Sequence, residues 1–270
     1  MMKHVVVTGG TRGIGCGMVK EFLSRGYNVT FCGTSDQTVM NAISSFTEQW
    51  SSKKFRGVVC DVSEKQDLIY LWDFGTKVFG DVDIWINNAG INNFQESFHK
   101  LSMDIIMKII DTNIKGLMYA THLAYNNMLK QGKGFIYNTG GLGSDGRIIR
   151  GLTPYGMSKR AVQYFTKAFA REIEKDHNVK IGLLLPGMVL TDMLLDSIRR
   201  GDDNSRKLKR VYNLLAYEVE PVTEYLVNKI IENDKNGVTI SYSSSLKTFL
   251  KVPGRFISGR DIVSKKLRMS

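Results

Sequence analysis

Short apolar runs and longer amphipathic stretches alternate along the chain from its first residues. Runs rich in Val, Ile and Leu are typical of buried strands, and the stretches between them have the periodicity of helices with one apolar face. The predicted strands cover residues 3–8, 26–32, 55–62, 82–86, 134–138, 179–185 and 237–242. This alternation predicts one α/β domain over residues 1–270, a Rossmann-type doubly wound sheet of seven parallel strands with helices on both faces.

The segment between the last two predicted strands departs from this alternation. Residues 192–235 are rich in Met, Leu and Arg and are predicted to form inserted helices. These helices would cover the carboxyl end of the sheet as a substrate lid. Residues 243–270 form a basic and partly apolar C-terminal tail, to which the sequence assigns no role.

The composition is that of a globular protein with a sizeable core, because 43% of the 270 residues are hydrophobic and 23% are charged. No apolar stretch reaches the roughly 18 residues of a membrane span. The first predicted strand begins at residue 3, which leaves no room for a signal peptide. The 3 cysteines, Cys16, Cys32 and Cys60, have irregular spacings that suggest neither a disulfide framework nor a metal site. We therefore expect a cytoplasmic protein without a bound metal.

The net charge of +11 is concentrated late in the chain, in residues 199–210 and 247–268. A nucleic acid is one partner for such charge, but no nucleic-acid-binding motif accompanies it, so we expect no nucleic acid partner. The charge instead indicates a solvated basic face or attraction for an anionic small-molecule substrate. Peripheral contact with anionic lipid stays open as a third explanation.

A glycine-rich turn follows the first predicted strand and precedes an amphipathic helix. Its spacing is GxxxGxG over residues 9–15. In this context the glycines let the backbone approach a pyrophosphate, and the start of the helix faces the negative charge. The residues predicted to bind a dinucleotide here are Gly9, Thr11, Arg12, Gly13, Ile14 and Gly15.

The residues after the second strand bear on which dinucleotide is bound. An acidic residue in this place would bind the ribose 2′-hydroxyl of NAD, but the chain has Gly33, Thr34 and Ser35, with Asp36 only later. Neutral hydroxyls together with the cation of Arg12 tolerate a 2′-phosphate, so NADP(H) is favoured over NAD(H). The alternative is that Arg12 points to solvent and that either cofactor is used.

Polar and small residues follow the third and fourth strands. Asp61, followed by Val62, can accept a hydrogen bond from an adenine amine, although a strand-end cap is the plainer role. Asn88, Ala89 and Gly90 lie where a ligand crosses the edge of an open parallel sheet.

Asn113 interrupts the apolar pattern of a helix that begins near residue 102. A buried asparagine must be hydrogen-bonded, so Asn113 has either a structural role or a place in a polar site.

Tyr155 and Lys159 are four residues apart in a predicted helix, so their side chains share one face. At their ordinary pKa values, about 10 and about 10.4, neither group is tuned to neutral pH. A neighbouring ammonium favours the phenolate and lowers the pKa of the tyrosine, which makes the phenol a general acid and base. A chance pairing on a surface helix is the alternative that this spacing alone leaves open.

Taken in order, these motifs resemble the short-chain dehydrogenase/reductase family over nearly the whole chain. The matching residues are 8–15, 61–62, 87–90, Asn113, 155–159 and the turn from Pro186 and Gly187 to Thr191. The resemblance implies hydride transfer between the nicotinamide of NADP(H) or NAD(H) and a carbonyl or alcohol carbon. It also implies a homodimer or a homotetramer.

The resemblance further implies a role for each matching residue. Tyr155 would donate the proton in the reducing direction. Lys159 would lower the pKa of Tyr155 and bind the nicotinamide ribose, and Asn113 would hold a water between Lys159 and solvent. The residues that would position the carboxamide are Pro186, Gly187, Val189 and Thr191.

One residue of the family pattern is missing. The family usually places a serine after the fifth strand to hydrogen-bond the substrate carbonyl, but the matching position is Gly141 when counted from the strand and Leu142 when counted back from Tyr155. The hydroxyls available nearby are those of Thr139 and Ser144, and we expect Ser144 to take the role. The rival hypothesis is that Tyr155 alone polarises the carbonyl.

The loop at residues 138–147, with segments 220–227 and 233–237, is similar to the chlorophyll(ide) b reductase branch of the family. That branch reduces a formyl group on a large anionic tetrapyrrole. We therefore expect an NADP-dependent oxidoreductase acting on a carbonyl or alcohol carbon of a bulky substrate, with an anionic one as the candidate. The alternatives are a 3-oxoacyl thioester or hydroxysteroid reductase of the same fold, and a non-catalytic NADP(H)-binding regulator.

Overall fold

The seven strands in the described part of the chain form one parallel sheet, which confirms the predicted Rossmann-type fold. The computed structural model describes residues 3–93, 96–174, 177–199, 203–242 and 261–269. The strands run in the order β3-β2-β1-β4-β5-β6-β7, and all neighbouring strands are parallel. Their bounds are β1 His4–Val7, β2 Asn28–Gly33, β3 Phe55–Val59, β4 Ile84–Asn87, β5 Gly134–Thr139, β6 Val179–Leu185 and β7 Thr239–Ser241.

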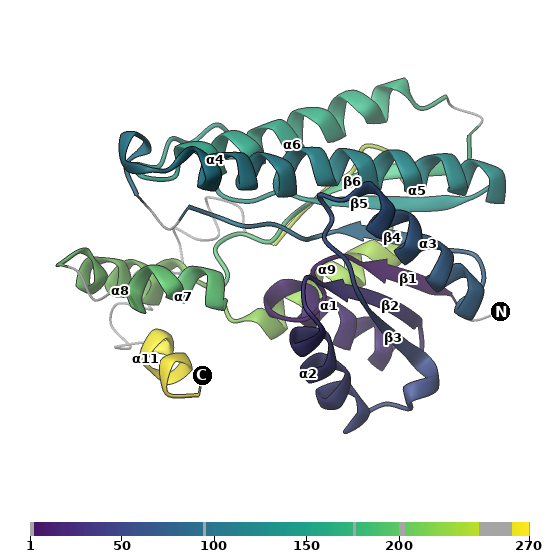
Figure 1. Ribbon diagram of the computed structural model, residues 1–270, viewed down its shortest axis with the longest axis horizontal. Coiled ribbons are helices and arrows are strands. Elements are labelled where there is room, and N and C mark those ends of the chain that lie inside the picture. Colours follow the sequence, from purple (N-terminus) through teal and green to yellow (C-terminus); the bar gives the residue numbers. More distant parts are fainter. Residues whose placement is uncertain (1–2, 94–95, 175–176, 200–202, 243–260, 270) are drawn as a thin grey trace.

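Helices cover both faces of this sheet (Figure 1). One face is covered by α1 Gly13–Ser24, α2 Asp36–Thr47 and α9 Val219–Glu232. The other is covered by α3 Lys65–Phe79, α4 Met103–Ile110, the π-helix η3 Asp111–Gly116, α5 Leu117–Gln131 and α6 Thr153–Glu172. The remaining elements are the 3₁₀ turns η1 Ser52–Lys54 and η2 Phe98–Lys100 and the helices α7 Asp192–Arg199, α8 Asp203–Leu215 and α11 Ile262–Met269.

The central strands are apolar on both sides because both sides are buried. Along β1, Val5 and Val7 face the cluster that contains Phe22 of α1, whereas Val6 faces the cluster that contains Trp85. All five side chains have no exposed surface. Burial on both faces explains the nearly continuous apolar runs in the sequence, as expected of a parallel sheet.

The strand order reverses direction at the middle of the sheet, and this reversal positions the site. From β1 the chain builds outward to β2 and β3, then crosses back to β4 on the other side of β1. Val7 at the end of β1 pairs with Phe31 of β2 and with Ile86 of β4. The connections that leave the ends of β1 and β4 diverge to opposite faces, and an open α/β sheet binds its ligand in the crevice between them.

The predicted lid at residues 192–235 consists of two different parts. Its last helix, α9, packs against α1, and Val222 and Leu226 of α9 are fully buried in the same cluster as Phe22. The assignment of α9 to a lid is therefore wrong, because its apolar face is needed to cover the sheet. In the described part of this segment, α7 and α8 lie to one side of the sheet (Figure 1), and a lid role for these two stays a prediction.

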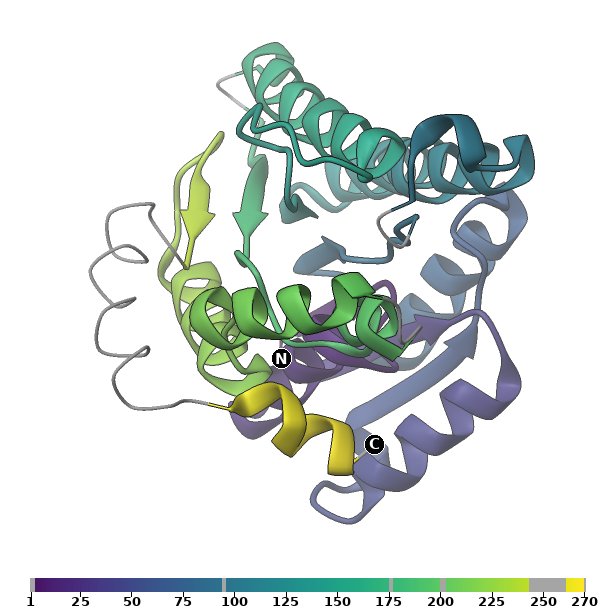
Figure 2. The same cartoon turned by 90° about the vertical axis from the view of Figure 1, so that its left-hand side faces the viewer.

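The two helices α7 and α8 pack against the C-terminal helix α11 (Figure 2). Leu195 of α7, Tyr212 of α8 and Val263 of α11 are buried together in a small apolar cluster. Asn213 adds polar contacts, since its side chain donates to Asp261 at 3.0 Å and accepts from the Val263 amide at 3.0 Å. Of the predicted C-terminal tail, residues 243–260 and 270 lie outside the described residues.

Across the described ranges, no helix is both long and apolar enough to cross a bilayer.

We expect Leu226→Ala to lower the free energy of unfolding by about 2–5 kcal/mol, because it empties a fully buried position in α9. Ile231→Ala is the matched control on the same helix, since its side chain is 37% exposed and should cost less than about 1 kcal/mol. Chemical denaturation of both variants measures the difference. Equal small losses would mean that α9 is not part of the core.

Candidate active site

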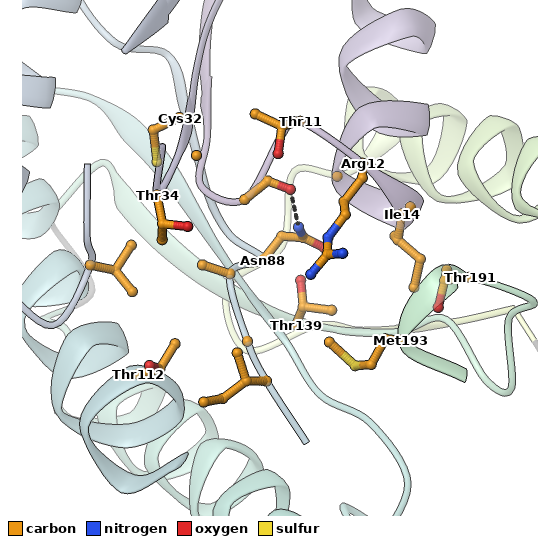
Figure 3. Close-up of a pocket in the computed structure, with 18 of the residues that line it drawn as sticks. Thr11, Arg12, Ile14, Cys32, Thr34, Asn88, Thr112, Thr139, Thr191 and Met193 are labelled. Atoms are coloured by element: carbon orange, nitrogen blue, oxygen red, sulfur yellow. Dashed lines mark hydrogen bonds between the residues drawn. The ribbon is translucent and has the colours of Figure 1, made fainter. Parts of the chain in front are cut away.

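A cavity of about 430 Å³ opens at the carboxyl ends of the central strands, at the reversal point of the sheet (Figure 3). Most of the residues predicted to bind a cofactor line it, although they come from segments far apart in the sequence. These residues are Gly9, Thr11, Arg12, Gly13, Ile14, Gly15, Thr34, Asp61, Val62, Asn88, Ala89, Gly90, Tyr155, Lys159 and Thr191.

The glycine turn is held against the segment after β4. Gly9 has φ +64°, and a Cβ there would lie only 2.9 Å from the Ala89 Cα, so no other residue fits without a shift of the backbone. The side-chain Nδ2 of Asn88 donates to the carbonyls of Thr8 at 3.0 Å and Gly9 at 3.1 Å, and Figure 3 marks one bond from Asn88. This bracing leaves the start of α1, at Gly13, facing the cavity, where its free amides suit a phosphate group.

The predicted adenosine-side residues are only partly brought together. Thr34 lines the cavity, but Ser35 does not, because its side chain caps α2 and accepts from the Thr38 amide. Asp61 lines the cavity and accepts from the amide and hydroxyl of Ser63 at 2.9 and 2.7 Å. Arg12 is exposed and extends from the glycine turn over the cavity (Figure 3).

Tyr155 and Lys159 lie in the first turns of α6 and both line the cavity. The Lys159 Nζ is 5.8 Å from the centre of the Tyr155 ring and donates to the Thr139 carbonyl at 3.1 Å. The strand β5 ends at that carbonyl, so strand and helix together fix the position of the amine. The two groups share one side of the helix, as their spacing predicts.

Burial controls the protonation of this pair in the protein alone. It raises the pKa of Tyr155 to about 12 and lowers the pKa of Lys159 to about 8. The predicted lowering of the Tyr155 pKa by Lys159 is therefore wrong for the protein alone, because desolvation by burial sets the direction of the shift. At neutral pH the phenol is protonated, which suits a proton donor.

Asn113 connects three elements from within the π-helix η3. Its carboxamide oxygen accepts from the Ile91 amide at 2.9 Å, and its nitrogen donates to the Ile91 carbonyl and the Ser158 hydroxyl, both at 2.9 Å. A π-helix is a rare, wide turn that is often found at functional sites. Asn113 thereby fixes the segment after β4 against α6, and its role in holding a water stays a prediction.

Ser144 does not face either of the two cavities at the site, and its predicted contact with the substrate is wrong. Its buried hydroxyl accepts from the Gly141 amide at 2.9 Å and donates to the Lys159 carbonyl at 3.1 Å. These bonds use its only proton to hold the loop on α6. Of the two candidate positions for the family serine, Gly141 lies beside the phenol, since a Cβ there would lie 2.5 Å from the Tyr155 hydroxyl.

A second cavity of about 320 Å³ adjoins the first, and Tyr155 lines both. Glycines 140 and 141 form one side of it, and Pro186, Gly187 and Val189 lie on another. Apolar side chains from the loop before α6 and from the helices α7 and α8 complete it, and these are Leu142, Ile149, Leu152, Leu194, Leu208, Val211 and Tyr212. The second cavity is thus the apolar one, and it meets the first at the phenol.

Several residues that line the first cavity were not predicted. Cys32 and Cys60 belong to strand ends, where their apolar character gave no signal. Lys108 comes from α4 and Thr112 from η3, and only tertiary contacts bring them to the cavity. Thr139 was considered only as a substitute for the serine. Within the described residues, no three His, Cys, Asp or Glu side chains gather as metal ligands.

Comparison with known proteins identifies the family. A family model described as short chain dehydrogenase matches residues 3–200. The chain belongs to this family. It is therefore an oxidoreductase of the NAD(P)-dependent type that acts on CH–OH or C=O groups, as the sequence motifs predict.

Three relatives match much of the chain. Chlorophyll(ide) b reductase NOL from Oryza sativa is 34% identical over 264 residues, which are 95% of this chain and 76% of that protein. Probable chlorophyll(ide) b reductase NYC1 from Arabidopsis thaliana is 30% identical over 93% of this chain, which spans about half, 52%, of its length. A 3alpha-hydroxysteroid dehydrogenase from Mediterraneibacter gnavus is 34% identical over 71% of this chain and 76% of its own length.

Solved structures support the fold. Levodione reductase superposes with a TM-score of 0.80 at 22% identity, covering 89% of this chain and 96% of the reductase. A short chain dehydrogenase/reductase from Burkholderia phymatum in complex with NAD has a TM-score of 0.80 at 19% identity, covering 95% and 94%. At these identities the similarity establishes the architecture.

The prediction of a cytoplasmic location is wrong. The chlorophyll(ide) b reductases from Oryza sativa and Arabidopsis thaliana that match this chain are described as chloroplastic. The cytoplasmic location was inferred from apolar periodicity and cysteine spacing. These patterns carry no information about an organelle, so they could not support that inference.

The lowered pKa of Lys159 predicts how stability depends on pH. Because the folded-state pKa is about 8 and the ordinary value is 10.5, the unfolded chain binds more protons between these values, so stability rises with pH there. The full difference corresponds to about 3 kcal/mol. Lys159→Met removes the group and should lack this rise when both proteins are denatured chemically from about pH 7 to about pH 10. If the free energy of unfolding depended on pH in the same way in the parent and in Lys159→Met, the burial of a charged amine would be contradicted.

Proposed function

We propose that this protein is an NADP-dependent reductase of a carbonyl group on a bulky anionic substrate, with the formyl group of chlorophyll(ide) b as the best-supported candidate. The observation that carries the proposal is the position of Tyr155 at the junction of the two cavities. One cavity has the phosphate-binding turn of a dinucleotide site, and the other is apolar.

The geometry supports reduction with Tyr155 as the proton donor. The residues that line the first cavity would hold a nicotinamide cofactor, which would supply a hydride when bound. The Tyr155 hydroxyl would give its proton to the carbonyl oxygen of the substrate. A phenol with a pKa of about 12 is protonated at neutral pH and is ready for this role. Lys159, held by the Thr139 carbonyl, stabilises the phenolate that remains.

The second cavity supports an apolar substrate group. Gly141 leaves no side chain beside the Tyr155 hydroxyl, and Leu208, Val211 and Tyr212 of α8 also line this cavity. The same helix has Arg206, Lys207 and Arg210, which favour an anionic group outside the cavity. This arrangement suits the edge of a tetrapyrrole that has carboxylate substituents.

The relatives support the same substrate class and a plastid location. The chlorophyll(ide) b reductases match over nearly the full chain, whereas the hydroxysteroid dehydrogenase covers 71% of it. Because these reductases are chloroplastic, we infer a chloroplast as the compartment of this protein.

A hydroxysteroid or 3-oxoacyl thioester reductase is the second candidate. It is favoured by the relatives named 3alpha-hydroxysteroid dehydrogenase and 3-oxoacyl-[acyl-carrier-protein] reductase, which are 34% and 32% identical over 71% of the chain. The apolar cavity suits these substrates as well. A non-catalytic regulator is disfavoured because Tyr155 and Lys159 are both placed for proton transfer.

The first test measures the turnover of chlorophyllide b with NADPH. The reaction is monitored through the loss of NADPH absorbance and through the change in the pigment spectrum. We expect Tyr155→Phe to reduce kcat by at least about 100-fold, because it removes the proton donor, while NADPH still binds. Steroid and acyl thioester ketones are the comparison panel. Turnover by Tyr155→Phe at the parent's rate would refute the mechanism, and a preference for the panel would favour the second candidate.

The second test concerns the choice of cofactor. We expect NADPH to bind more tightly than NADH, and Arg12→Ala to weaken NADPH by about 10-fold while changing NADH by less than about 2-fold, because only NADPH has the 2′-phosphate. Arg12→Lys is the matched control, since it keeps the charge and should recover part of the difference. Equal affinities of the parent for both cofactors would contradict the NADP preference.

A further inference from the structure

Thr139, the last residue of β5, has a buried hydroxyl without a partner. Its side chain is 5% exposed, and its Oγ1 makes no hydrogen bond in the described structure. Among the described residues, the other buried side-chain polar atom of this kind is the Asn93 Oδ1, and only Thr139 lines the first cavity. Buried hydroxyls are nearly always satisfied, so this one requires an explanation.

The neighbouring residue on β5, Asn138, has a buried polar side chain whose hydrogen bonds are made within the protein. The side chain of Asn138 accepts from Asn87 at 2.8 Å and donates to Thr166 at 3.0 Å, within a closed network on the other side of the strand. Successive side chains of a strand point to opposite faces. Thr139 therefore points away from that network, and Figure 3 shows it inside the cavity between Asn88 and Met193.

The position of Thr139 indicates a contact with the cofactor and not with the substrate. Thr139 lines the first cavity with Tyr155 and Lys159, but it does not line the second, apolar cavity. Its carbonyl holds the Lys159 Nζ at 3.1 Å, which places it at the Lys159 end of the site. Thr34 and Asp61, the predicted adenosine-side residues, belong to the ends of other strands.

We propose that Thr139 is a cofactor-positioning residue whose hydroxyl hydrogen-bonds the nicotinamide riboside of NADP(H). A valine would fill the same space without an unsatisfied polar group, so the hydroxyl is explained by a partner that arrives with the ligand. The inference rests on the cofactor site of the proposed function and not on its substrate. With Thr139 bound to the cofactor, the Tyr155 hydroxyl is the group that acts on the substrate carbonyl.

The test compares Thr139→Val with Thr139→Ser in the full chain, using calorimetry to measure the Kd of NADPH. We expect the valine variant to weaken NADPH binding by about 5–10-fold, as for the loss of one hydrogen bond, and the serine variant to stay within about 2-fold of the parent. The Kd of adenosine 2′,5′-bisphosphate should be unchanged in both variants, because this probe lacks the nicotinamide riboside.

Thermal unfolding without ligand separates this role from a structural one. Since the hydroxyl has no protein partner, Thr139→Val should unfold at or above the temperature of the parent. Three results would overturn the proposal: parental NADPH affinity in Thr139→Val, an equal loss for the bisphosphate probe, or a lowered unfolding temperature. A parent that binds no NADPH would instead refute the cofactor site itself, which keeps the two failures distinguishable.

Discussion

The site depends on one positive charge that is held away from water. Burial lowers the pKa of Lys159 to about 8, which destabilises the ammonium, and a buried cation of this kind needs a hydrogen-bonding partner. The Thr139 carbonyl provides that partner at the end of β5. Because the carbonyl belongs to the sheet and the amine to α6, the charged group is in place only when the strand and the helix are packed together.

Around this charge, two regions of the fold form the two cavities of the site. The reversal of strand order beside β1 opens the space for a dinucleotide, and Asn88 and Asn113 brace its walls through side-chain bonds to the backbone. The helices α7 and α8 enclose the apolar cavity beside it. The first cavity is thus formed mainly by strand ends, and the second is enclosed by a helical unit that packs on α11.

Local patterns sufficed for those features whose signal lies within one short stretch of the sequence. The seven strands, the glycine turn and the Tyr155–Lys159 pair are of this kind. The assignments of α9 and Ser144 failed because each depends on a distant partner. The apolar face of α9 is needed by α1, and the hydroxyl of Ser144 is used by Gly141 and Lys159. The exposure of a hydroxyl in a glycine-rich loop cannot be inferred before the loop is folded.

The close approach of Gly141 to Tyr155 limits which side chains position 141 can accept. A Cβ there would lie 2.5 Å from the Tyr155 hydroxyl and 3.2 Å from the Lys159 Cγ, so even an alanine would displace one of these groups. Both neighbours are side-chain atoms and not backbone, so the loop itself could keep its conformation. A substitution at this position would therefore disturb the alignment of the phenol before it disturbed the stability of the fold.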